Sequence, residues 1–222
     1  MKHKMTMILC SCAALAACTP SLRAATTLLD NTSAAISPTS GVFMYPSWQH
    51  ALLFSTGSTA YDLRSIEFAV RGFNSPQTGS VTLSLYSGST PSDPALASQT
   101  FNGLSFPTTP TSFTENLADG FSLAANSNYT LVFAGSASEV QLSTTTTGDT
   151  LSGGTSGLTY LGRKLSTDSG STWSGSVEFT TPWMKLSGTA VGTPAVPEPS
   201  SLALLALGAT GLIARRRRQQ AA

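Results

Sequence analysis

Cysteine and histidine are almost missing from this chain of 222 residues. The three cysteines, Cys10, Cys12 and Cys18, all lie near the N-terminus, so the rest of the chain forms no disulfide and depends on core packing. Only one histidine, His50, follows residue 3, and this count excludes a His/Cys metal site. A Ser-His-Asp triad would have to use His50, and no G-x-S-x-G motif accompanies it. We therefore expect neither a metal nor a cofactor.

Charge is also scarce, at 10% of the residues, and it is unevenly placed. Seven of the twelve basic residues lie near the two ends of the chain: Lys2, Lys4, Arg23, Arg215, Arg216, Arg217 and Arg218. Residues 25–196 hold the other five basic residues and ten acidic ones, which gives this body a net charge of −5. An acidic body argues against nucleic acid as a partner.

The body has no stretch with a convincing helical period, but it has many short strand patterns. Residues 65–71, 80–86 and 128–133 alternate apolar and polar side chains, as strands with one buried face do. Weaker strand patterns occupy residues 51–54, 98–104, 112–117, 140–143, 177–181 and 184–190. Proline and glycine punctuate the segments between them.

These patterns predict an all-β protein, an antiparallel β-sandwich of jelly-roll-like form that covers residues 25–188. Residues 144–156 are rich in Thr, Gly and Ser, and we expect a long loop or an irregular edge there. Residues 189–195 have the composition of a flexible linker.

The N-terminus has the pattern of a secretory signal peptide over residues 1–24. Two lysines precede an apolar run over residues 5–17. Cleavage after Ala24 is the favoured interpretation, with the Sec translocon as the export partner. The alternative is a lipobox, because Leu15, Ala16 and Ala17 precede Cys18, which would then be lipidated as the mature N-terminus.

The C-terminus combines three parts in a fixed order. A stiff motif of Val196, Pro197, Glu198 and Pro199 leads into an apolar run over residues 202–214, and a block of four arginines, 215–218, follows. As a helix the run would span roughly 20 Å, short of the roughly 30 Å hydrocarbon core, so it is a weak transmembrane segment. The arginines should stop it at the cytoplasmic side.

This order of parts resembles the PEP-CTERM sorting signal of Gram-negative bacteria that make exopolysaccharide. The resemblance covers residues 196–218. It implies that an exosortase is the processing partner. It also implies that the precursor is inserted transiently in the inner membrane before the protein reaches the cell surface or the extracellular space.

Three segments of the body, residues 54–66, 79–87 and 121–132, resemble the choice-of-anchor exported β-domains, type R in particular. Members of that family share such a domain but carry different anchoring tails. The resemblance implies an architecture and a location, and it implies no reaction.

Residues 166–173 fit the S-x-D-x-G-x-x-W pattern called the Asp box, which is known from sialidases. The residues that carry the pattern are Ser166, Asp168, Gly170 and Trp173. In such a turn the Asp accepts hydrogen bonds from the backbone, the Gly allows a positive φ and the Trp packs beneath. A propeller would repeat the motif, and one copy is present, so we expect a structural hairpin turn.

Three aromatic residues in loop-like sequence, Tyr45, Trp48 and Tyr160, are candidates for stacking on sugar rings. The alternative for these aromatics is core packing. Glycoside hydrolysis would need two acids facing one cleft, and the acids of the body are scattered.

We therefore expect a non-enzymatic protein with a structural or adhesive role in exopolysaccharide or biofilm. A carbohydrate-binding module is one alternative, and a polysaccharide-active hydrolase or lyase is the other.

Overall fold

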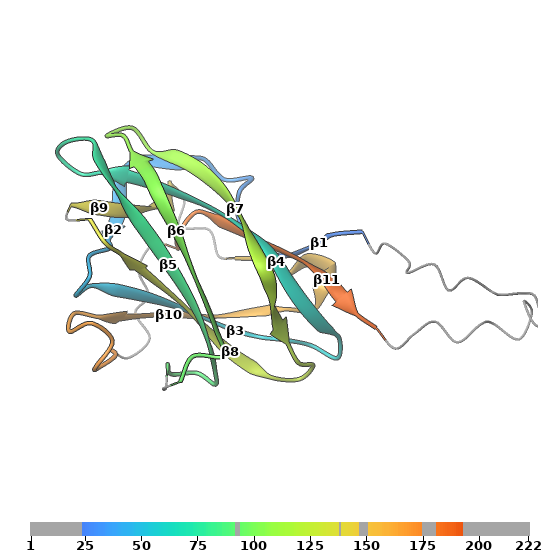
Figure 1. The fold of residues 1–222 in the computed structure, drawn as a ribbon. Coiled ribbons are helices and arrows are strands. Elements are labelled where there is room, and N and C mark those ends of the chain that lie inside the picture. The colour runs from blue at the N-terminus through green and yellow to red at the C-terminus, as the bar shows by residue number, and fades with distance from the viewer. Residues whose placement is uncertain (1–23, 92–93, 138, 147–150, 175–180, 193–222) are drawn as a thin grey trace, which may run out of the picture.

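The computed structural model describes residues 24–91, 94–137, 139–146, 151–174 and 181–192, and these residues form two antiparallel sheets (Figure 1). Sheet A contains β1 (Thr26–Asp30), β2 (Ile36–Phe43), β4 (Ala60–Gly72), β7 (Thr111–Leu123), β9 (Val140–Thr145) and β11 (Met184–Val191). Sheet B contains β3 (Gln49–Ser55), β5 (Gln77–Ser87), β6 (Ala97–Phe106), β8 (Asn128–Gly135) and β10 (Thr159–Ser166). A single 3-10 turn, Gly154–Ser156, is the only helical element among the described residues. The expected all-β class with antiparallel sheets is confirmed.

Alternation along the strands sends one face of each sheet into the core. In β5, Val81, Leu83 and Leu85 are buried. Between them, Thr82 and Ser84 point outward and pair with hydroxyls of β6 at 2.9 Å. The period of two that is visible in the sequence is therefore the period of the fold.

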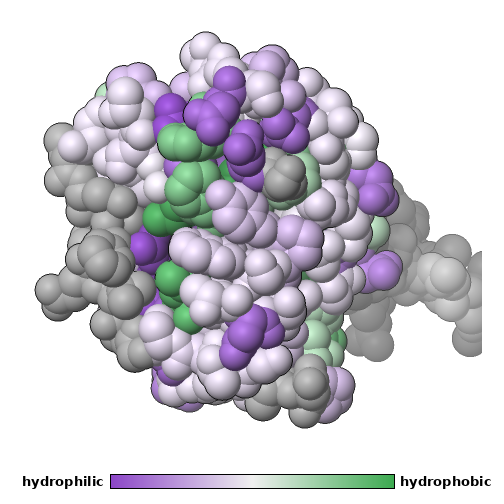
Figure 2. All heavy atoms as spheres, turned by 90° about the vertical axis from the view of Figure 1, so that its left-hand side faces the viewer, coloured by the Kyte–Doolittle hydropathy of each residue, from purple (hydrophilic) through white to green (hydrophobic). Residues whose placement is uncertain are grey.

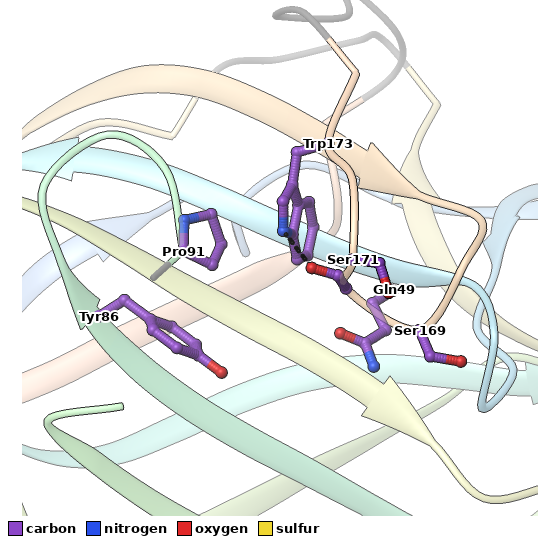
Figure 3. Close-up of a pocket in the computed structure, with 7 residues that line it drawn as sticks. Gln49, Tyr86, Pro91, Ser169, Ser171 and Trp173 are labelled. Atoms are coloured by element: carbon purple, nitrogen blue, oxygen red, sulfur yellow. Dashed lines mark hydrogen bonds between the residues drawn. The ribbon is translucent and has the colours of Figure 1, made fainter. Parts of the chain in front are cut away.

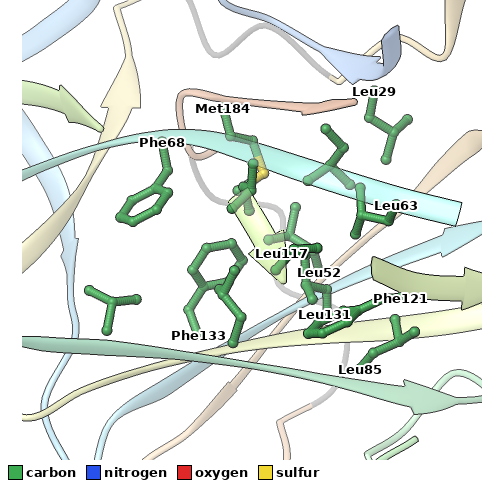
Figure 4. Close-up of a cluster of buried hydrophobic side chains, with 14 of the residues drawn as sticks. Leu29, Leu52, Leu63, Phe68, Leu85, Leu117, Phe121, Leu131, Phe133 and Met184 are labelled. Atoms are coloured by element: carbon green, nitrogen blue, oxygen red, sulfur yellow. The ribbon is translucent and has the colours of Figure 1, made fainter. Parts of the chain in front are cut away.

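The hydrophobic core lies between the two sheets. Figure 4 shows Phe68 and Met184 of sheet A above Leu131 and Phe133 of sheet B. The rings of Phe68 and Phe133 meet edge to face, with their centroids 6.1 Å apart. Each such fully buried side chain contributes roughly 1.5–3 kcal/mol to the stability of a body that has no disulfide.

Strand β4 gives the sandwich its length and defines its two ends. Its 13 residues span about 40 Å. At its Ala60 end it pairs with β11, which in turn pairs with β1, so the two ends of the body lie side by side there. At its Gly72 end it pairs with β9, which pairs with β2 (Figure 1). We call these the chain-end pole and the distal pole.

The strands expected at residues 51–54, 65–71, 80–86, 98–104, 112–117, 128–133, 140–143 and 184–190 are all confirmed. Strands β1, β2 and β10 were not expected. Strand β2 contains Pro38 at an irregular stretch of an outer strand, where proline is tolerated although it weakens the pattern.

Two boundaries differ from the expectation. Strand β11 continues to Val191, paired with Ala60, so residues 189–191 belong to the sheet and not to a linker. Strand β9 takes in Thr144 and Thr145, which were expected in a loop and are buried.

Several expected features lie outside the described residues: residues 1–23 of the expected signal peptide, the strand portion at 177–180, and the whole tail from residue 193. Cys18 and the arginines at 215–218 are among them. Within the residues that are described, no helix is long and apolar enough to span a bilayer.

Candidate functional site

Four aromatic side chains gather at the distal pole. Phe43 lies in the middle, with its ring centroid 5.2 Å from that of Tyr45, 6.5 Å from that of Trp48 and 5.0 Å from that of Phe73. Tyr45 and Trp48 also contact each other, at 5.9 Å. We call Phe43, Tyr45, Trp48 and Phe73 the aromatic cluster. Two of the three residues expected to stack on sugars, Tyr45 and Trp48, are therefore brought together.

A tight turn presents Tyr45 and Trp48. The Tyr45 N–H donates to the Trp48 carbonyl and the Trp48 N–H donates to the Tyr45 carbonyl, each at 3.1 Å. Pro46 and Ser47 occupy the two central positions, and proline pre-sets the backbone there. Both aromatic side chains are therefore held at the ends of one closed turn.

A buried arginine fixes the strands beneath the cluster. Arg71 is only 7% exposed, and its Nε and one of its terminal nitrogens donate to Oε1 of Gln141 at 2.9 and 2.6 Å. It also donates to the carbonyls of Pro38 and Thr39 in β2, at 2.6 and 2.7 Å. Gln141 is the register partner of both Phe43 and Arg71. The network therefore joins β2 to β4 and keeps Phe43 beside Phe73.

His50 supports the same position from the interior. Its Nε2 lies 2.6 Å from the Phe43 carbonyl, and because a carbonyl only accepts, Nε2 carries the proton and donates. Burial lowers the pKa of His50 to about 4, the hydrogen bond to Phe43 opposes this change, and the charge of Arg163 lowers the pKa further. His50 is thus buried and uncharged at neutral pH, and its hydrogen bond to the Phe43 carbonyl gives it a structural role.

The cluster is open to solvent and carries little charge. The side chains of Trp48 and Phe73 are 37% and 43% exposed. Figure 2 views this end of the sandwich and shows hydrophobic residues gathered in a strip among hydrophilic ones. Burial raises the pKa of Tyr45, and the nearby carboxylate of Glu139 raises it further. Such a surface offers ring faces and edges to a neutral ligand with apolar C–H groups.

Tyr160 does not join the cluster. The prediction that it lies in a loop is wrong, because it belongs to β10, pairs with Phe54 of β3 and packs against the core. Burial raises the pKa of Tyr160, while Arg163 and a hydrogen bond with Thr181 lower it. Its ring is turned into the sandwich, so it is no platform on the surface.

The Asp-box residues form the closed turn that the motif predicts. Asp168 accepts from the Ser166 hydroxyl at 2.7 Å and from the Thr172 N–H and hydroxyl at 2.8 and 2.6 Å. Ser166 Oγ in turn accepts from the Gly170 N–H at 2.8 Å, and Gly170 has a φ of 89°. The Trp173 Nε1 donates to the Gly170 carbonyl at 3.1 Å. We call residues 166–173 the Asp-box turn.

Hydrogen bonds to Thr172 and Ser166 hold the pKa of Asp168 at about 2. The carboxylate is thus occupied within its own turn, which is the behaviour of a structural acid.

Two of the other described acids, Asp62 and Asp30, are occupied by contacts of their own. Asp62 pairs with Arg64 at 3.0 Å and accepts from Ser122, and Asp30 binds Thr32. Asp93, Asp149 and Glu178 lie outside the described residues. Among the residues that are described, no three His, Cys, Asp or Glu side chains group in a way that would hold a metal ion.

Two of the four cluster residues, Phe43 and Phe73, were not predicted from the sequence. Phe43 ends β2 and Phe73 directly follows β4, thirty residues further along the chain. Only Phe73 offered a signal, as an aromatic residue just after the strand pattern at residues 65–71, and this signal is weak because such positions often cap a core. Phe43 offered none, since no strand was expected to end there.

Comparison with family models matches residues 195–218 to the PEP-CTERM protein-sorting motif. No curated protein and no solved structure matches the chain. The match covers only the tail, and it confirms the sorting signal that was expected at residues 196–218. Because exosortase recognises such motifs, the chain is an exported protein that exosortase processes.

Proposed function

We propose that the mature protein has a structural or adhesive role in an exopolysaccharide matrix or biofilm, and that the aromatic cluster is the surface that contacts the polysaccharide. The observation that carries this proposal is the grouping of Tyr45, Trp48 and Phe73 around Phe43 at an exposed position. Ring faces pack well on the C–H faces of sugars, and the acidic body does not favour an anionic partner.

The position of the cluster also supports the proposal. The chain-end pole leads to both terminal segments, and about 40 Å of β4 separates it from Phe73. In the proposed precursor, residues 202–214 lie in the inner membrane, with Arg215 and its three neighbours on the cytoplasmic side. The cluster would then point away from the membrane, toward the matrix.

The body would serve as a choice-of-anchor type domain, delivered through the Sec translocon and released or displayed after cleavage near Val196–Pro199. Lipidation at Cys18 remains the alternative fate of the N-terminus. It would add a lipid anchor at the chain-end pole and leave the cluster at the opposite end.

A carbohydrate-binding module is the second candidate, and the same cluster favours it. It differs from the adhesive role in requiring selectivity for one glycan. A hydrolase or lyase would need two acids about 5–9.5 Å apart across a cleft. At the cluster, the acid whose charge is felt is Glu139, which raises the pKa of Tyr45. We therefore propose a non-catalytic role.

A retention assay tests this proposal. The exported protein is purified from the producing cells and passed over immobilised exopolysaccharide from the same cells. We expect Trp48→Ala to weaken retention about tenfold, since one stacked ring is worth roughly 1.5 kcal/mol. Leu96→Ala removes a side chain that is also exposed, at 57%, and should leave retention unchanged. Equal retention of wild type and Trp48→Ala would overturn the binding role, and release of reducing ends would favour the hydrolase.

The proposed route has a separate test in the producing cells. Replacing Pro197 and Glu198 together should block processing, so that the precursor keeps its full mass and stays in the inner-membrane fraction. The paired control replaces Pro107 and Glu115 of the body. An unchanged mature mass and location in the Pro197 and Glu198 variant would contradict the proposed route.

A further inference from the structure

A hollow lies on the outer face of sheet B, next to the Asp-box turn. Its volume is about 240 Å³, and its lining includes Tyr86, Trp173, Gln49, Ser169 and Ser171. Figure 3 shows Tyr86 on one side and the two serines and Gln49 on the other, with the Trp173 ring facing the same space. Pockets that enclose drug-sized ligands measure roughly 300–1,000 Å³, so this hollow suits a single ring.

The two aromatic walls are anchored on an apolar floor. Ala51 and Leu53 of β3 and Val132 of β8 form a small buried cluster, and Tyr86 and Trp173 pack against it. These three floor residues face away from the main core. Trp173 is further held by its hydrogen bond to the Gly170 carbonyl. Both rings therefore keep their places without a ligand, which lowers the entropic cost of binding.

The described part of the rim of the hollow is polar and uncharged. Gln49 brings an amide, and Ser169 and Ser171 bring hydroxyls, so donors and acceptors lie beside the rings. Of the lining residues that the structure describes, none carries a charge. The nearest acid of the turn, Asp168, is occupied by Ser166 and Thr172. An aromatic wall with neutral hydrogen-bonding groups matches a sugar ring, which has apolar C–H faces and a belt of hydroxyls.

We propose that this hollow is a second sugar-binding site, which holds one neutral pyranose ring between Tyr86 and Trp173. The proposal deepens the adhesive role proposed above, because it gives one domain two places to hold polysaccharide. The Asp-box turn then does more than close a hairpin: it carries Trp173 and both serines to the site.

The two places are joined through the backbone. The Ser169 N–H donates to the Ser47 carbonyl at 3.0 Å, and Ser47 precedes Trp48 and Gln49. The turn that presents Trp48 to the aromatic cluster thus also places Gln49 in the hollow. A domain with two nearby sites would gain avidity for a repeating polymer, since the second contact is intramolecular.

Calorimetric titration of the exported protein with methyl glycosides of glucose, galactose and mannose, each to about 10 mM, tests the second site. At least one glycoside should bind the wild type. Tyr86→Ala should weaken this binding about tenfold, and Tyr86→Phe, which keeps the ring, should leave it within about twofold. Gln49→Ala removes one polar partner without touching the floor and should weaken binding about threefold. Circular dichroism checks that each variant is folded.

The result separates this site from the cluster. The second site is supported if Tyr86→Ala and Gln49→Ala both weaken binding of the glycoside by these factors while Trp48→Ala leaves it unchanged. It is overturned if no glycoside binds the wild type, or if folded Tyr86→Ala and Gln49→Ala bind as the wild type does. The adhesive role of the cluster fails separately, when Trp48→Ala leaves retention on polysaccharide unchanged.

Discussion

The aromatic cluster and the Asp-box turn are neighbours, yet they are held in opposite ways. The cluster rests on Arg71, whose hydrogen bonds reach residues 32, 33 and 70 positions away in the chain. The Asp-box turn closes through bonds between residues two to four positions apart. Long-range contacts therefore position the rings of the cluster, whereas short-range contacts shape the turn, which the bond from the Ser169 N–H to the Ser47 carbonyl holds beside them.

The largest effect is expected where the long-range network is cut. Arg71→Ala leaves Gln141 and the Pro38 and Thr39 carbonyls without their donor, and we expect it to lower the free energy of unfolding by about 4 kcal/mol. Because Phe43 loses its support, polysaccharide retention should fall too. Urea denaturation measures the first effect. Arg64→Ala removes an arginine that is 46% exposed and should cost less than about 1 kcal/mol. Similar costs for both variants would contradict the role of the network.

The second effect concerns His50, which hydrogen-bonds the Phe43 carbonyl. His50 has a pKa of about 4 in the fold, against roughly 6.5 in an unfolded chain. The fold therefore keeps its full stability above about pH 6.5 and loses about 3 kcal/mol as the pH falls from 6.5 to 4. Urea midpoints measured across this range should show the loss, and His50→Gln should flatten it. A wild-type profile that is flat between pH 6.5 and 4 would show that His50 is not held neutral.

A smaller effect is expected in the Asp-box turn. Gly170 has a φ of 89°, and a Cβ there would lie 3.0 Å from Oε1 of Gln49. Gly170→Val should cost about 2 kcal/mol, because a branched side chain is strained at positive φ. Gly88 has a φ of 86°, and a Cβ at this position would meet nothing within 4 Å, so Gly88→Val isolates the backbone strain. Thermal denaturation of both variants gives the difference, and an equal loss would remove any role for the contact with Gln49.

The smallest effect is the acid response of Asp168. Its pKa of about 2 lies below the roughly 3.9 of an unfolded chain, so the turn contributes stability above about pH 4 and loses it as the pH falls toward 2. This window lies below that of His50, so the two responses can be separated in one pH series. Asp168→Asn should remove the lower one and leave the upper one. If the loss of stability between about pH 4 and 2 persists in Asp168→Asn, another carboxylate is responsible for it.

The same contrast explains what the sequence made predictable. The Asp-box turn was foreseen residue by residue, because the bonds that close it lie within eight positions of chain. Strands with clear alternation, such as β5 and β8, were foreseen for a similar reason. Residues 195–218 were recognisable because a sorting signal is itself a linear pattern.

Contacts between distant segments were not predictable. Phe43 and Phe73 meet only because Gln141 pairs with both β2 and β4. Tyr160 was expected at the surface, but its pairing with Phe54 turns it inward. The order of the strands and the irregular strand β2 follow from the same tertiary pairings, which no local pattern encodes.

The three tryptophans allow the most direct test of the proposed polysaccharide contact. Trp48 lies in the cluster, Trp173 in the hollow, and Trp183 is 7% exposed and donates to the Ala34 carbonyl. Their indole N–H signals, assigned through single Trp→Phe variants, can be followed by NMR while oligosaccharides from the exopolysaccharide are added. The account predicts that the Trp48 signal shifts with saturation and that the Trp183 signal stays in place. A saturable interaction that leaves the Trp48 signal unmoved would contradict it.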